Sequence, residues 1–171
     1  MTTDISSIGI NLIADFITEA DERDILSHIE PTKVKKTDQR NSIKRFGAIT
    51  YNNYIVSREI PGWLEIISLK MINLGLLKKM PDSVSINEYQ IGQTVRPHID
   101  NKESGEIISI LSLRTNAIMK MEKGDEIFLI ELCPRSLLQL SGESRWLWKH
   151  GILPVDQLRF SIVFRNSNDY A

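Results

Sequence analysis

The chain of 171 residues contains little cysteine, little histidine and no long apolar run. Cys133 is the only cysteine, so no internal disulfide can form, which is typical of a reducing compartment, and we expect its thiol to be a small buried hydrophobic group. The first residues lack the basic start and apolar stretch of a signal peptide, and no segment is apolar over the length of a bilayer. We therefore expect a cytoplasmic, monomeric protein that makes no membrane contact.

Neither sign of charge dominates, because 21 Lys and Arg side chains face 22 Asp and Glu side chains. Such a chain has no global attraction to a polyanion, and binding to nucleic acid needs a local patch. One candidate patch lies within residues 31–45, where a single acidic residue accompanies six basic ones: Lys33, Lys35, Lys36, Arg40, Lys44 and Arg45. A short basic run is also common on ordinary solvated surface, so both interpretations stay open.

The hydrophobic pattern predicts two helices followed by a series of strands. A first helix should begin at Thr18, and a second should run from near Pro61 to Gly75 with an apolar stripe of Trp63, Ile66, Ile67, Met71 and Leu74. From residue 84 onward, β-rich segments alternate with glycine-containing turns, at 84–89, 107–113, 117–121, 127–132, 136–140 and 158–165. This order predicts one α+β domain whose strands form an antiparallel sandwich or barrel.

A possible metal site is indicated by His98 and Asp100. Residues two apart in an extended segment point to the same side, so an imidazole and a carboxylate would converge there. They could supply two ligands of a 2-His-1-carboxylate face, which leaves positions open on a non-haem iron, although a histidine that caps a turn fits the same spacing. The remaining histidines are His28, on the polar face of the first helix, and His150, which follows two residues that could enclose a dry pocket, Trp146 and Trp148.

The last predicted strand has an unusual polar face. Phe160, Ile162 and Phe164 would share one face, and Arg159, Ser161, Val163 and Arg165 would share the other. Arginines bind carboxylates through a two-pronged fork, so a dicarboxylate could match this face, although the strand alone favours a solvated face with surface ion pairs. Asn87 and Tyr89 add neutral hydrogen-bonding groups on one face of an earlier strand.

In this order, the elements resemble the AlkB family of iron- and 2-oxoglutarate-dependent oxygenases. The resemblance covers residues 84–165, with a fainter match at residues 44–47, and includes the runs 87–93 and 97–100. The run 134–138 and the stretch Ser-Gly-Glu-Ser-Arg-Trp-Leu-Trp-Lys-His-Gly-Ile at 141–152 also match, and this stretch most resembles the branch that hydroxylates a modified wobble uridine in transfer RNA. The resemblance implies a double-stranded β-helix, or jelly roll, with supporting N-terminal helices.

The resemblance also implies cofactors and residue roles. Fe(II) would be bound by His98, Asp100 and His150, and 2-oxoglutarate by Asn87, Tyr89, Arg159, Ser161 and Arg165. The family often has asparagine where this chain has Ser161, which leaves the role of that position open. The basic residues of the 31–45 patch, Lys33, Lys35, Lys36, Arg40, Lys44 and Arg45, lie where the family places a substrate-covering lid, and we expect them to bind substrate.

We therefore expect one oxygenase domain over residues 1–171, with helical support and lid in 1–83 and the catalytic jelly roll in 84–171. The expected activity is oxidative demethylation or hydroxylation of nucleic acid, either RNA or alkylated DNA. A hydroxylase or demethylase acting on protein is the alternative, since the fold does not dictate the substrate. A scaffold that has lost activity is disfavoured, because it would not need the complete set of metal and carboxylate ligands.

Overall fold

The computed structural model describes residues 5–29, 42–51 and 54–167, with the backbone alone for residues 48–51 and 54–57. A larger antiparallel sheet contains, in spatial order, β1 (Ile10–Ile13), β9 (Leu137–Leu140), β6 (Ile108–Leu113), β11 (Arg159–Arg165), β4 (Ser83–Tyr89), β2 (Ser42–Tyr51) and β3 (Tyr54–Arg58). A smaller antiparallel sheet contains β5 (Val95–His98), β10 (Lys149–Ile152), β7 (Ala117–Lys123) and β8 (Glu126–Leu132). The helices are α1 (Glu19–Ser27), α2 (Gly62–Asn73) and the short α3 (Gly142–Trp146).

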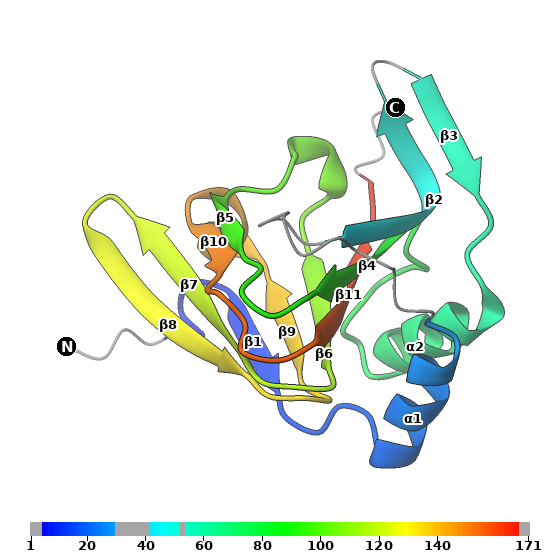
Figure 1. Cartoon of the computed structure of the whole chain (residues 1–171). Coiled ribbons are helices and arrows are strands. Elements are labelled where there is room, and N and C mark those ends of the chain that lie inside the picture. The colour runs from blue at the N-terminus through cyan, green and yellow to red at the C-terminus, as the bar shows by residue number, and fades with distance from the viewer. Residues whose placement is uncertain (1–4, 30–41, 52–53, 168–171) are drawn as a thin grey trace.

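These elements form three layers, in which the larger sheet lies between the smaller sheet and the helices α1 and α2 (Figure 1). On β11, Phe160, Ile162 and Phe164 join the core on the helix side, whereas Val163 joins the core between the sheets. The alternation predicted for this strand is therefore confirmed. The two-sheet jelly roll with supporting helices is confirmed as well, and each of the six predicted strands lies within two residues of an observed strand.

The first helix is fixed at both its start and its middle. The Thr18 side chain accepts from the Asp21 amide, and the Asp21 carboxylate accepts from the Thr18 amide, which forms a capping box. One turn later, the buried Glu22 carboxylate accepts from the Arg114 amide at 2.7 Å and from Arg135 Nη1 at 3.2 Å. Glu22 therefore ties α1 to two turns of the sandwich.

Several expectations on packing need correction. Helix α2 buries Leu64, Ile67 and Met71, but the apolar side chains of Ile66 and Leu74 are exposed because they face away from the larger sheet. Cys133 is exposed instead of buried, because it lies in the turn between β8 and β9 and not within a strand. The N-terminal half also contributes three strands that hydrophobic periodicity did not indicate, β1, β2 and β3.

Candidate metal and co-substrate site

His98, Asp100 and His150 meet at the open end of the space between the two sheets. Their ligand atoms all lie within 4.8 Å of one another. Asp100 Oδ1 lies 3.1 Å from His98 Nε2 and 3.7 Å from His150 Nε2. His98 ends β5 and is paired with His150 on the neighbouring strand β10, so sheet register brings together two residues that are far apart in the sequence. These three side chains could hold one metal ion on one face and leave its other face open.

The protonation of the cluster suits a metal site. Burial lowers the pKa of His150 to about 4, so its ring is neutral and its lone pair is free to coordinate. Burial opposes the charged form of Asp100, but the hydrogen bond with His98 and the charge of Arg165 outweigh it and hold the pKa of Asp100 well below its usual range. The hydrogen bond to Asp100 also raises the pKa of His98.

Neighbouring groups hold the three ligands in place. His98 Nδ1 lies 3.0 Å from the Arg96 carbonyl, so Nδ1 must carry the proton that it donates and Nε2 faces Asp100. Arg165 donates to Asp100 Oδ2 through Nε and Nη2, both at 2.9 Å, which leaves Oδ1 for a metal. Gly151 allows β5 to approach β10 closely, because a Cβ there would lie 2.6 Å from the Val95 carbonyl oxygen.

A cavity of about 230 Å³ extends from these ligands into the space between the sheets. Arg159 and Tyr89 are paired across β11 and β4, and the Arg159 guanidinium lies 4.9 Å from the centre of the Tyr89 ring. The next pair on the same face is Ser161 with Asn87, whose amide donates to the serine hydroxyl at 3.5 Å. Sheet register thus aligns the four side chains in two adjacent rows that line the cavity.

Arg159 is the strongest indication of an anionic ligand. The side chain is fully buried, and Nη2 donates to Ser112 Oγ at 3.1 Å. Among the described residues, no group accepts a hydrogen bond from its Nε or Nη1, and none forms an ion pair with it. Burial lowers the pKa of Arg159, as expected for a cation taken out of water. An isolated buried charge is costly, and a carboxylate that entered through the cavity could pair with it.

Other expectations on the site need correction. Trp148 packs in the core against Phe128, and Trp146 lies under the Arg145 guanidinium, so neither tryptophan lines the cavity. The apolar lining comes instead from Val95, Ile108, Ile110, Met119, Ile152 and Val163. Only the alternation along each strand could have indicated these residues. His28 lies away from the cavity, stacked on Trp63 at a ring distance of 5.3 Å.

The basic residues of the 31–45 patch are only partly described. Lys33, Lys35, Lys36 and Arg40 lie outside the described residues. Lys44 is exposed, with its Nζ 5.5 Å from the centre of the Phe46 ring, and does not line the cavity. Arg45, on the opposite face of β2, does line it.

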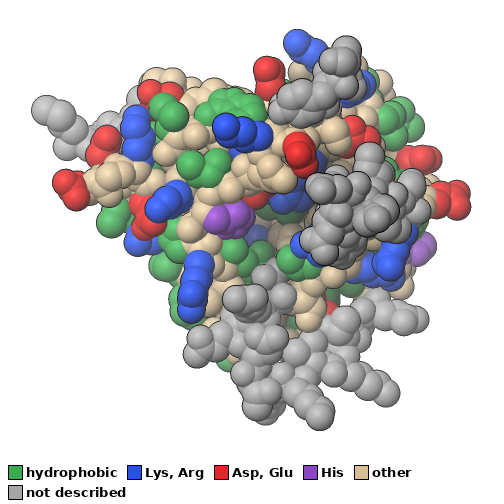
Figure 2. All heavy atoms as spheres, turned by 90° about the horizontal axis from the view of Figure 1, so that it is seen from above, with side chains coloured by type: hydrophobic (Ala, Val, Ile, Leu, Met, Phe, Trp, Pro, Cys, Tyr) green, Lys and Arg blue, Asp and Glu red, His purple; other side chains and the backbone are tan. Residues whose placement is uncertain are grey.

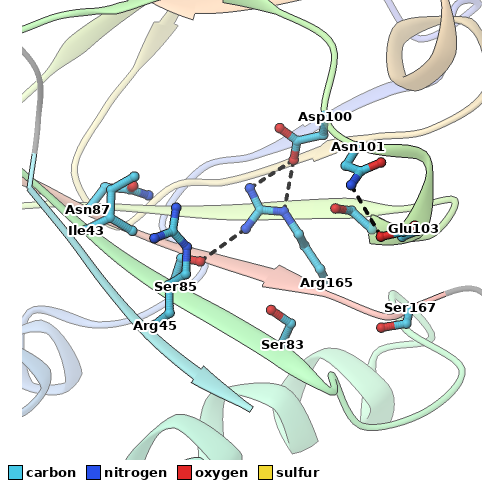
Figure 3. A pocket seen from close by; sticks show the side chains of 11 residues that line it. Ile43, Arg45, Ser83, Ser85, Asn87, Asp100, Asn101, Glu103, Arg165 and Ser167 are labelled. Carbon is cyan, nitrogen blue, oxygen red and sulfur yellow. Dashed lines mark hydrogen bonds and ion pairs between the residues drawn. The ribbon is translucent and has the colours of Figure 1, made fainter. Parts of the chain in front are cut away.

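A second cavity of about 340 Å³ adjoins the first and shares Ile43, Arg45, Asn87, Asp100 and Arg165 with it. Figure 3 shows Arg45 on one side, Asn101 and Glu103 on the other, and the Arg165 guanidinium between them. Apart from Ile43, every side chain in its lining is polar or charged. Arg45 has no ion-pair partner among the residues that the structure describes, whereas Arg165 is paired with Asp100.

A two-sheet jelly roll with two histidines and one carboxylate at its open end is the arrangement of mononuclear non-haem iron oxygenases. The model of the 2OG-Fe(II) oxygenase superfamily matches residues 38–165. The chain belongs to this superfamily, and its cofactors are Fe(II) and 2-oxoglutarate.

Curated relatives support the resemblance to the AlkB family. A tRNA (carboxymethyluridine(34)-5-O)-methyltransferase alkbh8 of Xenopus tropicalis is 34% identical over 159 residues, which is 85% of this chain but 25% of the relative. This chain thus spans about a quarter of that relative's length. A protein of Acanthamoeba polyphaga mimivirus, L905, is 30% identical, with 92% of this chain and 84% of the relative covered.

Solved structures share the fold. OsALKBH1 superposes with a TM-score of 0.67 at 18% identity, over 92% of this chain and 98% of that one. A prolyl-4-hydroxylase of Pseudomonas putida gives a TM-score of 0.62 at 16% identity, over 96% of both chains. Within the described residues, none of the helices has the length and apolar character that crossing a membrane requires.

Proposed function

We propose that this chain oxidises nucleic acid, with Fe(II) held by His98, Asp100 and His150. When bound, iron and 2-oxoglutarate together use O₂ to insert one oxygen atom into a C–H bond of the substrate, while 2-oxoglutarate is converted to succinate and carbon dioxide. A hydroxylated N-methyl group would leave as formaldehyde, whereas a hydroxyl placed on a carbon substituent would remain. The catalytic domain in this proposal comprises residues 1–171, with residues 1–83 supporting the jelly roll and covering the substrate.

The residues around the first cavity have separate tasks in this proposal. Arg159 binds the distal carboxylate of 2-oxoglutarate, and Tyr89, Asn87 and Ser161 position the rest of the molecule by hydrogen bonds. Arg165 holds Asp100 in a fixed orientation and adds positive charge beside the metal. The apolar lining excludes water from the reacting groups, which strengthens the electrostatic contacts inside.

The polar second cavity carries the assignment to nucleic acid. It opens beside Asp100, so a group held there lies next to the metal ligands. Its hydroxyls, amides and charges suit a nucleotide with many hydrogen-bonding groups better than an apolar ring such as that of proline, which can form no hydrogen bond with them. The Arg45 guanidinium, which forms no ion pair with any described residue, could bind a phosphate or another anionic group. Figure 2 shows basic and acidic side chains mixed over the face seen from above, so phosphate contacts must be local.

The relatives support the same substrate class, because the name of the Xenopus relative refers to a modified uridine in transfer RNA. We include Lys33, Lys35, Lys36, Arg40, Lys44 and Arg45 in the proposal as contacts to phosphates around the active site. A base that reacts must reach the metal, so unpaired or flipped nucleotides should be preferred.

Mass spectrometry of defined pools tests this function. The protein would be incubated with Fe(II), 2-oxoglutarate and either transfer RNA, methylated single-stranded oligonucleotides or peptides. We expect oxidised nucleosides, and an RNA affinity that falls with salt because phosphate contacts release counterions. Arg45→Gln should raise KM for the oligonucleotide. Arg114→Gln is the control and should not raise it, because Arg114 follows the C-terminal end of β6, whereas Arg165 is paired with the N-terminal end of β6. Oxidised peptides with no oligonucleotide binding at low salt would reverse the assignment.

A further inference from the structure

Arg145 is a buried arginine with no direct part in either cavity. It lies on α3, four residues before the start of β10, which carries His150, and its side chain is only 2% exposed. All three kinds of guanidinium nitrogen donate to backbone carbonyls: Nε to Gly105 at 2.9 Å, Nη1 to Asp100 at 3.1 Å and Nη2 to Asn101 at 2.6 Å. The guanidinium also lies 4.1 Å from the centre of the Trp146 ring. One side chain therefore fastens both ends of the segment from Asp100 to Gly105.

That segment contributes to both cavities. Asp100 is one of the three candidate ligands, and the residues that follow it line the second cavity: Asn101, Glu103 and Ser104. Its far end is confined as well, because Gly105 has a φ of +81° and a Cβ there would collide with the Asn166 carbonyl oxygen. Between these ends the segment has only a short 3₁₀ helix, Lys102–Ser104, so its shape depends on anchors outside itself.

We propose that Arg145 is a positioning residue that sets the placement of Asp100 relative to His150 and shapes the wall of the substrate cavity. The segment that carries Asp100 is bonded to α3, and α3 leads into the strand that carries His150. A planar guanidinium spreads five donors over three nitrogens in fixed directions and can serve three separate carbonyls at once, whereas an amide has only two donors and the three donors of an ammonium group share one nitrogen. The effect of Arg145 on the substrate cavity rests on the proposed function, whereas its effect on the position of Asp100 does not.

Metal affinity of folded variants gives the first test. Mn(II) binding would be measured by electron paramagnetic resonance for wild type, Arg145→Gln and Arg145→Lys, below the unfolding temperature of each. We expect the Kd for Mn(II) to rise about 10–100-fold in Arg145→Gln, the usual range for a group that orients a metal ligand, and to rise less in Arg145→Lys. Arg135→Gln is the matched control, because Arg135 binds Glu22 away from the ligands and its loss should lower Tm without changing Mn(II) affinity.

A purely structural role for Arg145 would give a different pattern. Arg145→Gln would then lower Tm as Arg135→Gln does and would bind Mn(II) as tightly as wild type, and this result would overturn the proposal. If Arg145→Gln does not fold, Arg145→Lys decides by the same comparison.

Kinetic measurements test separately whether Arg145 shapes the substrate cavity. KM for an oligonucleotide should rise several-fold in Arg145→Lys while KM for 2-oxoglutarate stays constant, because β4 and β11 are untouched. An unchanged KM for an accepted oligonucleotide would overturn that part. If no oligonucleotide is a substrate at all, the proposed function fails, and the Mn(II) result still decides the role of Arg145.

Discussion

Substitution of Arg159 gives the sharpest test of whether an arginine in this site binds a ligand or only supports the fold. Its guanidinium is fully buried, donates to Ser112 and has two nitrogens without a hydrogen-bond partner in the described part of the chain. Arg159→Met fills a similar space without the charge, so the variant loses the Ser112 hydrogen bond and the contact with the Tyr89 ring but also avoids burying an isolated cation. We therefore expect a folded protein that no longer binds 2-oxoglutarate.

The size of the effect follows from the contacts. Truncating one partner of a buried charge pair costs about 2–5 kcal/mol, which raises Kd by roughly 30- to 4,000-fold. A ligand at about 100 times its Kd stabilises the folded state by about 2.7 kcal/mol, which corresponds to roughly 5–10 °C in Tm for a chain of this size. At the same ligand concentration, a variant whose Kd is raised roughly 30-fold is stabilised by less than about 1 kcal/mol, so its Tm should increase by less than roughly 4 °C.

Thermal unfolding in the presence of Mn(II), with and without 2-oxoglutarate, measures the increase in Tm caused by 2-oxoglutarate for wild type and for Arg159→Met. Arg159→Lys keeps the charge but not the fork, so it should give an intermediate shift. Arg135→Met is the control: it should lower Tm because its ion pair with Glu22 is lost, yet retain the full shift with 2-oxoglutarate. A full 2-oxoglutarate shift in Arg159→Met would refute the assignment of this arginine to the co-substrate.

Three further predictions concern pH, stability and strand packing. Because the pKa of His98 is raised in the folded protein, its protonated ring stabilises the apoprotein fully below pH 6.5, the ordinary pKa of histidine, and this stabilisation is lost as pH rises through the folded-state pKa. A metal binds the neutral ring, so Mn(II) affinity should increase over the same pH range. A Kd for Mn(II) that does not depend on pH would contradict this. Glu22→Gln should lower the free energy of unfolding by about 1–3 kcal/mol in urea without changing Mn(II) affinity, and equal stability would show that the link from α1 is unimportant. Gly151→Ala should push β5 away from β10 and weaken Mn(II) binding through His98, and a crystal structure with β5 unmoved would exclude this route.

Much of the site could be predicted from the sequence because strand alternation is a local property. A shift of β11 by one residue would turn Phe160, Ile162 and Phe164 into the cavity and Arg159 toward the helices, so the apolar residues fix the face on which the arginine lies. The same logic placed Asn87 and Tyr89 on one face of β4. His150 was indicated as a ligand by exclusion of His28 and by the family resemblance, but the pairing of its strand with that of His98 was not predicted, because no local pattern specifies which strands of the smaller sheet are neighbours.

The segment after Asp100 could not be predicted in the same way, because its partners carry no sequence signal. Arg145 binds three backbone carbonyls, and every residue offers the same acceptor, so no pairing of side-chain types identifies this contact. The exposed Cys133 and the two tryptophans illustrate the same limit, since residue type favours burial but only the chain path decides whether a position faces a core, a cavity or water. An alternating pattern therefore predicts the walls of this site, whereas the placement of Asp100 within it depends on an arginine 45 residues away.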